Sequence, residues 1–375
     1  MNSSLSVPAS LLPSISSNTA HILSFLFTTS YVGSIYLAQT RLFTPSSSSR
    51  SPSRTSSSTT TTTPNGSVPS SQPGIPPILA SDKDAFPQPT PSPSTEPSNT
   101  GGPKLGSRDH PLTIRRRMNA VICATSLSIS GVYYVVKSLS PASTSNSWQS
   151  AVRPTMSLLG LSTLNSFALS PSSIIVGGWR VLPYMLAPSL LIGPLFAMYL
   201  DGELPVLGGR RYGEGIWKRI KRGWREFGLV EIRNFIVGPI TEELVFRSTI
   251  LAVSILGRLP FKSMVFGTPM WFGIAHAHHA LEVYRKNGST KSAAVQALLA
   301  CLFQLTYTTL FGWFASYLFL RTGSVLPPLT AHIYCNMMGI YLPGSAIQRH
   351  PKQARGIWGS YFAGIAVFVW GLKRL

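Results

Sequence analysis

Two adjacent carboxylates and a guanidinium interrupt one apolar stretch of this chain: Glu242, Glu243 and Arg247. The stretch runs from about residue 229 to residue 256, which is longer than the roughly 20 residues that cross a bilayer. An ionisable side chain at that depth is costly, by about 2.5–3.5 kcal/mol on insertion scales, and is usually kept for a purpose. These three residues are therefore the first candidates for chemistry.

Two other apolar runs carry polar side chains at helical spacing. His276 and His279 are three positions apart and share a helix face, whereas His278 points elsewhere. His332 and Asn336 are four positions apart and also share a face. We therefore expect polar groups from three separate helices to meet at one site.

The spacing divides the work between the two carboxylates. Glu242 and Glu243 are about 100° apart around a helix. They therefore face different surroundings and cannot have the same role. Glu243 and Arg247 are four apart, which makes an ion pair within the helix feasible and leaves Glu242 to face a cavity. A carboxylate there can act as a general base on water, a histidine can pass the proton to a leaving amine, and a second histidine with an asparagine can stabilise an oxyanion. Such a set hydrolyses an amide without a serine or cysteine nucleophile.

The composition predicts a membrane protein. Of 375 residues, 44% are hydrophobic and only 12% are charged, about half the charge density of a soluble domain. The net charge of +20 is explained by Lys and Arg gathered in loops on one side of a membrane, and no basic stripe with interleaved aromatics indicates nucleic acid. The three cysteines lie in apolar segments without a CxxC motif, so we interpret them as small buried hydrophobes.

The fold class that these patterns predict is all-α and polytopic, with about eight transmembrane helices around an intramembrane cavity that faces the cytosol. Three parts are expected: an N-terminal tail with a first span (1–43), a disordered Ser/Thr/Pro-rich loop (44–108), and a multi-span domain (109–375). The expected spans are about 20–38, 118–138, 174–200, 229–256, 261–280, 295–320, 325–342 and 357–372.

Charge sets the expected orientation. An even number of spans places both termini on the same side of the membrane. Because the loops rich in Lys and Arg are expected in the cytosol, both termini are expected on the opposite side. Residues 212–228 alternate Trp, Ile and Phe with Lys and Arg at helical spacing, which is typical of a helix lying in the interface of an anionic membrane. His276 then lies near the cytosolic end of its span, so the site is expected to open toward the cytosol.

The ordered motifs resemble a known family. Glu242-Glu243-Leu-Val-Phe-Arg247 fits EExxxR, Phe272-Gly-Ile-Ala-His276 fits FxxxH, and His332-Ile-Tyr-Cys-Asn336 fits HxxxN. In this order they resemble the type II CAAX prenyl proteases, the Ras-converting endopeptidases, within the wider CAAX protease and bacteriocin-processing family. The resemblance covers about residues 110–372 and excludes the Ser/Thr-rich loop.

The resemblance implies an eight-span protein of the endoplasmic reticulum membrane that removes the last three residues of prenylated CAAX proteins. Glu242 and His276 would activate the attacking water, and His332 with Asn336 would form the oxyanion hole. Glu243 and Arg247 would hold the site in shape. Neither a cofactor nor a metal is implied; the implied partners are the lipid bilayer and farnesylated or geranylgeranylated proteins such as Ras-type small GTPases.

Two alternatives stay open. In a zinc-dependent membrane protease, the ligands could be Glu242, His276, His279 and His332, although the chain has no HExxH motif. A non-catalytic membrane scaffold of the same family could also retain these residues. A transporter would be expected to show internal repeats, and we find none in the sequence.

Overall fold

The computed structural model is helical, with no strand in the part of the chain that it describes. The described residues are 14–39, 109–140, 149–162, 178–202, 204, 217–218, 221, 225, 227–275, 280, 283–285 and 287–375. The loop expected at 44–108 and most of the interfacial helix expected at 212–228 lie outside them. Those two expectations therefore stay predictions.

The helices follow one another along the described chain without any other regular structure between them. They are α1 (Ser17–Gln39), α2 (Pro111–Ser138), α3 (Gln149–Leu158), α6 (Gly178–Leu190), α7 (Ile192–Asp201), α9 (Leu229–Ile232), η4 (Arg233–Val237), α10 (Gly238–Glu243), η5 (Leu244–Thr249), α11 (Ile250–Leu256), η6 (Ser263–Gly267), α12 (Pro269–Ala275), α14 (Lys291–Thr322), α15 (Leu326–Met338), α16 (Pro343–Arg349), η7 (Pro351–Gln353) and α17 (Ala354–Arg374).

Three of these helices are long and apolar enough to cross a membrane, namely α1, α2 and α14. A fourth span results if α6 and α7 are counted together, since they meet at a bend of 55°. Pro183, Pro188 and Pro194 lie around this bend, and a proline inside a helix is a common cause of a kink. The all-helical membrane class is thus supported, whereas the count of eight spans stays a prediction.

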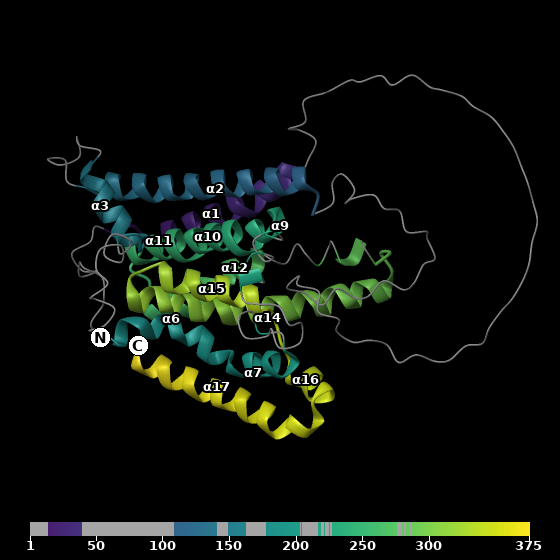
Figure 1. Cartoon of the computed structure of the whole chain (residues 1–375). Helices are drawn as coiled ribbons and strands as arrows, with labels where there is room; N and C mark the ends of the chain where they lie inside the picture. The colour runs from purple at the N-terminus through teal and green to yellow at the C-terminus, as the bar shows by residue number, and fades with distance from the viewer. Residues whose placement is uncertain are drawn as a thin grey trace, which may run out of the picture.

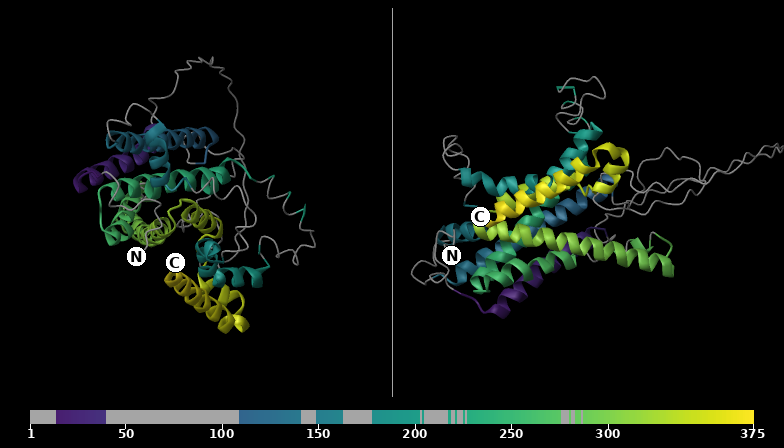
Figure 2. Two further views of the ribbon diagram at one scale, coloured as in Figure 1. Left: turned by 90° about the vertical axis from the view of Figure 1, so that its left-hand side faces the viewer. Right: turned by 90° about the horizontal axis from the view of Figure 1, so that it is seen from below.

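The helices lie roughly side by side, with α2 and α1 on one flank and α17 on the other (Figures 1 and 2). The helix containing α10, η5 and α11 packs against α1 and α2, while α15 packs against α10, α14 and α6. The segment with the two carboxylates is therefore in the interior of the bundle.

The carboxylate-bearing segment is one helical rod from Leu229 to Leu256 with two π-helical stretches, η4 and η5. Between them lies Pro239, which has no amide hydrogen to donate to the carbonyl four residues earlier. Two residues later, Thr241 donates its hydroxyl hydrogen to backbone carbonyls, with Val237 the nearer acceptor at 2.8 Å. π turns occur often at functional sites, and here they flank Glu242 and Glu243 on both sides.

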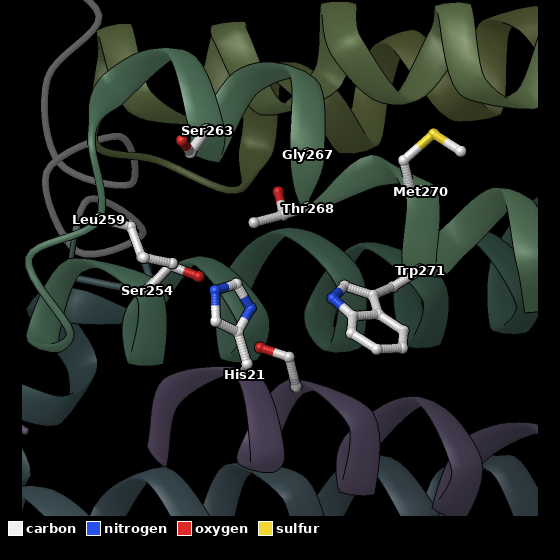
Figure 3. A pocket seen from close by; sticks show the side chains of 9 residues that line it. His21, Ser254, Leu259, Ser263, Gly267, Thr268, Met270 and Trp271 are labelled. Carbon is white, nitrogen blue, oxygen red and sulfur yellow. The ribbon is translucent and has the colours of Figure 1, made fainter. Parts of the chain in front are cut away.

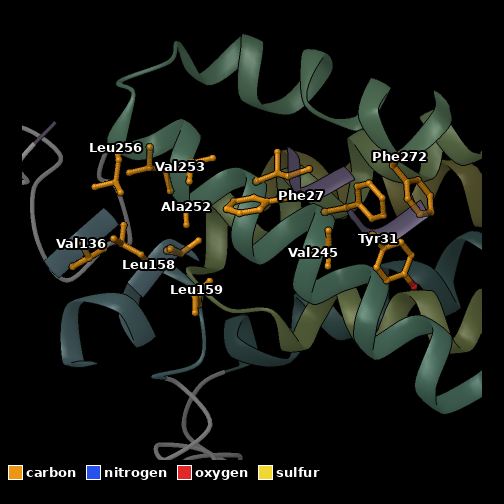
Figure 4. Close-up of a cluster of buried hydrophobic side chains, with 14 of the residues drawn as sticks. Phe27, Tyr31, Val136, Leu158, Leu159, Val245, Ala252, Val253, Leu256 and Phe272 are labelled. Carbon is orange, nitrogen blue, oxygen red and sulfur yellow. The ribbon is translucent and has the colours of Figure 1, made fainter. Parts of the chain in front are cut away.

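The main hydrophobic core joins the N-terminal helices to this rod (Figure 4). Phe27 and Tyr31 of α1 pack with Val245 and Phe246 of η5 and with Phe272 of α12. Burying such side chains stabilises a water-soluble protein mostly through the hydrophobic effect, but within a bilayer it acts through close packing and interhelical hydrogen bonds. An interhelical hydrogen bond of 2.9 Å joins the Tyr31 hydroxyl to Thr241 Oγ1.

Several sequence expectations need correction. Helix α2 begins at Pro111 and not near residue 118, so the arginines at 115–117 lie within its first turns. From there their long side chains can extend to the membrane surface. Helix α3 lies between the expected spans 118–138 and 174–200, in a segment where no helix was expected. Cys123 is exposed on α2 and not buried, although all three cysteines are free thiols as expected.

The seventh expected span is also shorter than predicted. Helix α15 has 13 residues, Leu326–Met338, against the 18 residues expected at 325–342. At 1.5 Å per residue it extends for roughly 20 Å, less than the roughly 30 Å of a hydrocarbon core. It begins with Pro327 and Pro328 in its first turn and ends at Gly339, whose φ of 63° terminates the helix.

Close packing between α12 and α14 predicts a stability difference between two glycines. A Cβ at Gly312 would lie 2.6 Å from Pro269 Cβ, whereas a Cβ at Gly33 would meet no atom within 4 Å. We expect Gly312→Ala to destabilise the protein by about 1–3 kcal/mol through overpacking, and Gly33→Ala to be neutral or stabilising because alanine favours a helix. Thermal melting of the detergent-purified proteins, followed by tryptophan fluorescence, measures both; an unchanged melting temperature for Gly312→Ala would contradict the packing described.

Candidate active site

The polar residues singled out in the sequence converge from two helices. Glu242 and Glu243 end α10, and Arg247 lies in the next turn, within η5. His332 and Asn336 lie on α15, which packs directly on α10 and η4. Because the last turns of α10 and the middle of α15 meet, groups 89 residues apart in sequence contact each other.

Glu243 is the central group of this cluster. Its side chain is 0% exposed, and its Oε1 accepts a hydrogen bond from Nδ1 of His332 at 2.7 Å. The same oxygen lies 3.3 Å from Nη1 of Arg247, so the intrahelical ion pair expected from the spacing is present. Glu243 thus fixes the orientation of His332 as well as pairing with Arg247.

Arg247 is enclosed by aromatic rings. Its guanidinium carbon lies 4.3 Å from the centre of the Phe272 ring and 5.5 Å from that of Phe311, both within cation–π range. The side chain is only 1% exposed. A charge so buried needs its partner, and Glu243 supplies it. Gly312 of α14 lies beside the guanidinium, since a Cβ built there would be in ordinary contact with Nη2 at 3.6 Å.

Glu242 lies on the opposite side of the His332 ring. Its Oε2 is 3.7 Å from His332 Nε2, and its side chain is 24% exposed against 0% for Glu243. The imidazole is therefore flanked by a carboxylate at each nitrogen. Of the two carboxylates, Glu242 is the one that water or a substrate can reach, which agrees with the division of work inferred from spacing.

Asn336 lies one turn from His332 and faces the same helix rod. Its Nδ2 donates to the backbone carbonyl of Asn234 in η4 at 3.0 Å. An amide nitrogen has two hydrogens, so this bond leaves a second one for another acceptor. Asn234 was not among the residues singled out in the sequence, because the contact is to its backbone carbonyl, which every residue type has.

The third helix expected at the site, the one with His276 and His279, is only partly described. His276, His278 and His279 lie outside the described residues, as does everything from 276 to 279. Phe272 is one helical turn before His276, and its ring packs against Arg247 and, at 6.4 Å between ring centres, against His332. The described part of α12 thus reaches the cluster, while the position of His276 and the cavity beside Glu242 stay predictions.

No three His, Cys, Asp or Glu side chains form a metal-binding group in the part of the chain that is described. His276 and His279 of the zinc alternative fall outside that part. The described residues therefore leave the zinc alternative to be decided by experiment.

Comparisons with known proteins agree with these motifs. The family model of the type II CAAX prenyl endopeptidase Rce1-like proteins matches residues 224–338, which include α10, η5, α12, α14 and α15. The chain is 31% identical to CAAX prenyl protease 2 of Homo sapiens over 272 residues, covering 72% of this chain and 73% of the relative. It is 30% identical to CAAX prenyl protease 2 of Saccharomyces cerevisiae over 250 residues, 64% of this chain and 74% of the relative.

A shorter and stronger similarity is found with a plant protein. CAAX prenyl protease 2 of Arabidopsis thaliana is 43% identical over 108 residues, 29% of this chain and 34% of the relative. No solved structure matches the chain.

The buried charges predict strong coupling between Glu243 and Arg247. Arg247→Met alone leaves the Glu243 carboxylate buried without its cation, which costs about 3–5 kcal/mol, whereas Glu243→Gln with Arg247→Met removes both charges and is expected to recover part of that loss. Thermal melting of the two single variants and the double variant gives the coupling free energy. Additive losses would show that the two side chains act independently.

Proposed function

Because the chain belongs to the type II CAAX prenyl endopeptidase family, we propose that it is an intramembrane protease that removes the three C-terminal residues from prenylated CAAX proteins. Its apolar helices and its family indicate a membrane protein. The proposed location is the endoplasmic reticulum membrane, with the site open to the cytosol. The proposed substrates are farnesylated or geranylgeranylated proteins, such as small GTPases of the Ras type.

One observation supports this function above the others: the imidazole of His332 is held at Nδ1 by the buried Glu243 while Nε2 faces the accessible Glu242. One water that lies beside this pair of atoms can form a hydrogen bond with each of them. A water in that position would meet a base on one side and a fixed ring nitrogen on the other. Such a preorganised pair suits hydrolysis, since little rearrangement accompanies the reaction.

In the proposed reaction, Glu242 and His276 take a proton from water, and the oxygen attacks the carbonyl carbon that follows the prenylated cysteine. The carbonyl oxygen becomes an oxyanion, which accepts hydrogen bonds from Asn336 and from His332. His332 donates from Nε2 when its ring carries hydrogens on both nitrogens, because Nδ1–H is held by Glu243. The C–N bond then breaks, and the proton taken from water goes to the leaving amine of the tripeptide.

Glu243 and Arg247 are positioning residues in this proposal. Neither side chain is accessible, so neither is expected to touch substrate. Their role is to hold His332 at a fixed distance from Glu242. Loss of the pair would change the geometry between Glu242, which acts on the water, and His332, which stabilises the oxyanion.

Substitution of the reactive groups tests the function. We expect Glu242→Gln and His276→Ala each to lower release of the tripeptide from a farnesylated peptide by at least about a hundredfold, since general acid–base catalysis contributes about that much or more. Protein abundance in the membrane is expected to stay nearly unchanged, because Glu242 is partly exposed.

A matched control is Glu231→Gln, which removes a carboxylate from the same helical rod. Glu231 accepts a hydrogen bond from the Gly228 amide at the helix start. At 1.5 Å per residue it lies roughly 16 Å from Glu242 along the rod. Its activity is expected to equal that of the unchanged protein. Wild-type turnover in both Glu242→Gln and His276→Ala would refute the proposed assignment. Equal cleavage of the unprenylated and the prenylated peptide would refute the proposed substrate class.

Chelation separates the glutamate mechanism from the zinc alternative. In the proposed reaction the base is a carboxylate, so purified protein treated with a strong chelator and dialysed is expected to keep its cleavage rate. Activity that disappears on chelation and returns only with zinc would replace the glutamate mechanism with a metal-dependent one. The peptide assay above serves as the readout, with a known zinc protease treated in parallel as the positive control.

A further inference from the structure

One buried polar side chain of α14 has no role in the site described above. Gln304 is only 3% exposed, and its amide nitrogen Nε2 has no hydrogen-bond partner among the described residues. The neighbouring side chains of Leu302 and Phe303 are exposed, so Gln304 is on the inner face of α14 and not on its lipid side. A buried N–H without an acceptor costs free energy, and more so in a bilayer, which supplies no water in exchange. The amide is therefore a candidate for contact with a bound molecule.

Helix geometry places Gln304 on the same face of α14 as a residue of the site. Phe311 comes seven positions later, which is two helical turns, and its ring centre lies 5.0 Å from that of His332. At 1.5 Å per residue, Gln304 is roughly 10 Å from Phe311 along the helix axis. The amide thus lies on the helix face that is turned toward His332, at a fixed distance along α14.

Helix α12 supports the same placement. A Cβ at Gly273 would lie 2.7 Å from Cδ1 of Leu305, the residue that follows Gln304. Gly273 in turn follows Phe272, whose ring packs against His332. Two separate contacts, one through Phe311 and one through α12, therefore place Gln304 beside the residues of the site.

Gln304 also lies at a level where a charged group can be bound. Helix α14 has 32 residues, so its length of roughly 48 Å exceeds the roughly 30 Å of a hydrocarbon core. It extends past the other helices at the end of the bundle where α9 lies (Figures 1 and 2). Gln304 is roughly 27 Å from the end of the helix at Thr322, close to the thickness of that core. This level is near a membrane surface, where an anionic group can keep contact with water.

A pocket lies on the other side of the site, between α1, the end of α11 and the η6–α12 segment (Figure 3). Its lining includes His21, Ser254 and Trp271. Ser254 is roughly 16 Å from Glu243 along the rod, toward the end opposite to α9. Because the accessible lining of this pocket is mostly apolar, it does not suit an anion. Gln304 is the better candidate for the polar end of a substrate.

The length of the proposed leaving group matches the position of Gln304. An extended chain advances about 3.3 Å per residue, so the C-terminal carboxylate of the substrate lies roughly 10 Å beyond the carbonyl that is attacked. Phe311 and Gln304 are separated by a similar length along α14, and His332 is at the level of Phe311. An amide donates N–H hydrogens, a carboxylate accepts them, and a charged acceptor makes the stronger bond.

On the basis of the proposed function, we propose that Gln304 binds the C-terminal carboxylate of the substrate and thereby fixes the length of the peptide that is removed. The carboxylate is common to every last residue, so the bond does not depend on which side chain that residue has. A chain that is one residue longer or shorter would displace its carboxylate by about 3.3 Å, which is enough to break the hydrogen bond. Gln304 is thus a specificity residue that acts on the end of the substrate.

Two farnesylated peptides test this contact. One ends in the free carboxylate, and the other ends in the corresponding alkylamine and lacks the carboxyl group. We expect the unchanged protein to cleave the first with a kcat/KM about tenfold higher, as one hydrogen bond to a charged group provides. Gln304→Leu is expected to lose most of this preference through a higher KM for the carboxylate peptide, while cleavage of the alkylamine peptide stays unchanged.

Gln296→Leu is the matched control, because Gln296 is an exposed glutamine of the same helix. Its preference for the carboxylate peptide is expected to equal that of the unchanged protein. Thermal melting checks the fold of both variants. Gln304→Leu replaces a buried amide that has no partner among the described residues, so its melting temperature is expected to stay the same or rise.

The outcomes separate this contact from a packing role. Equal losses of cleavage with both peptides in Gln304→Leu would assign the residue to packing and overturn the proposal, as would unchanged cleavage of both. Equal cleavage of the two peptides by the unchanged protein would also overturn it, although the proposed protease activity would stand. If the unchanged protein cleaves neither peptide, the proposed function fails, and the role of Gln304 fails with it.

Discussion

The site depends on one buried carboxylate that two helices share. Glu243 is fully buried, and its Oε1 contacts both Arg247 of its own rod and His332 of α15. Removing two charges from water is expensive, so the arrangement persists only because each charge has its partner and the rings of Phe272 and Phe311 cover the guanidinium. Glu243 therefore both balances the charge of Arg247 and links the helical rod to α15 through His332.

This constraint has a consequence for the neighbouring residue. Because Glu243 holds Nδ1, the His332 ring turns its Nε2 toward Glu242, which is the more exposed of the two carboxylates. Two adjacent residues thus serve different purposes by virtue of the helix geometry between them. Pro239 and the π turns of η4 and η5 set where along the rod this happens, and Tyr31 supports it from α1 through Thr241.

Some features could be predicted from the sequence because they depend on spacing along one helix. The Glu243–Arg247 pair and the shared face of His332 and Asn336 are of this kind. The partner of Asn336 and the aromatic cover of Arg247 could not, because Asn234, Phe272 and Phe311 are apolar-run residues whose neighbours lie on other helices. The length of α15 was overestimated, since hydropathy continues past the glycine that ends the helix.

By itself, the sequence determined the helical membrane class, the family and the residues able to do chemistry, because composition, periodicity and i, i+4 spacing are local properties. The tertiary structure alone decided which carboxylate is buried and that Glu243 reaches His332 across 89 residues of chain. It also decided that Phe311 of α14 packs against His332, which places the buried Gln304 on the same interior face. Such contacts follow from how helices pack, and packing depends on the shapes of all the side chains between them.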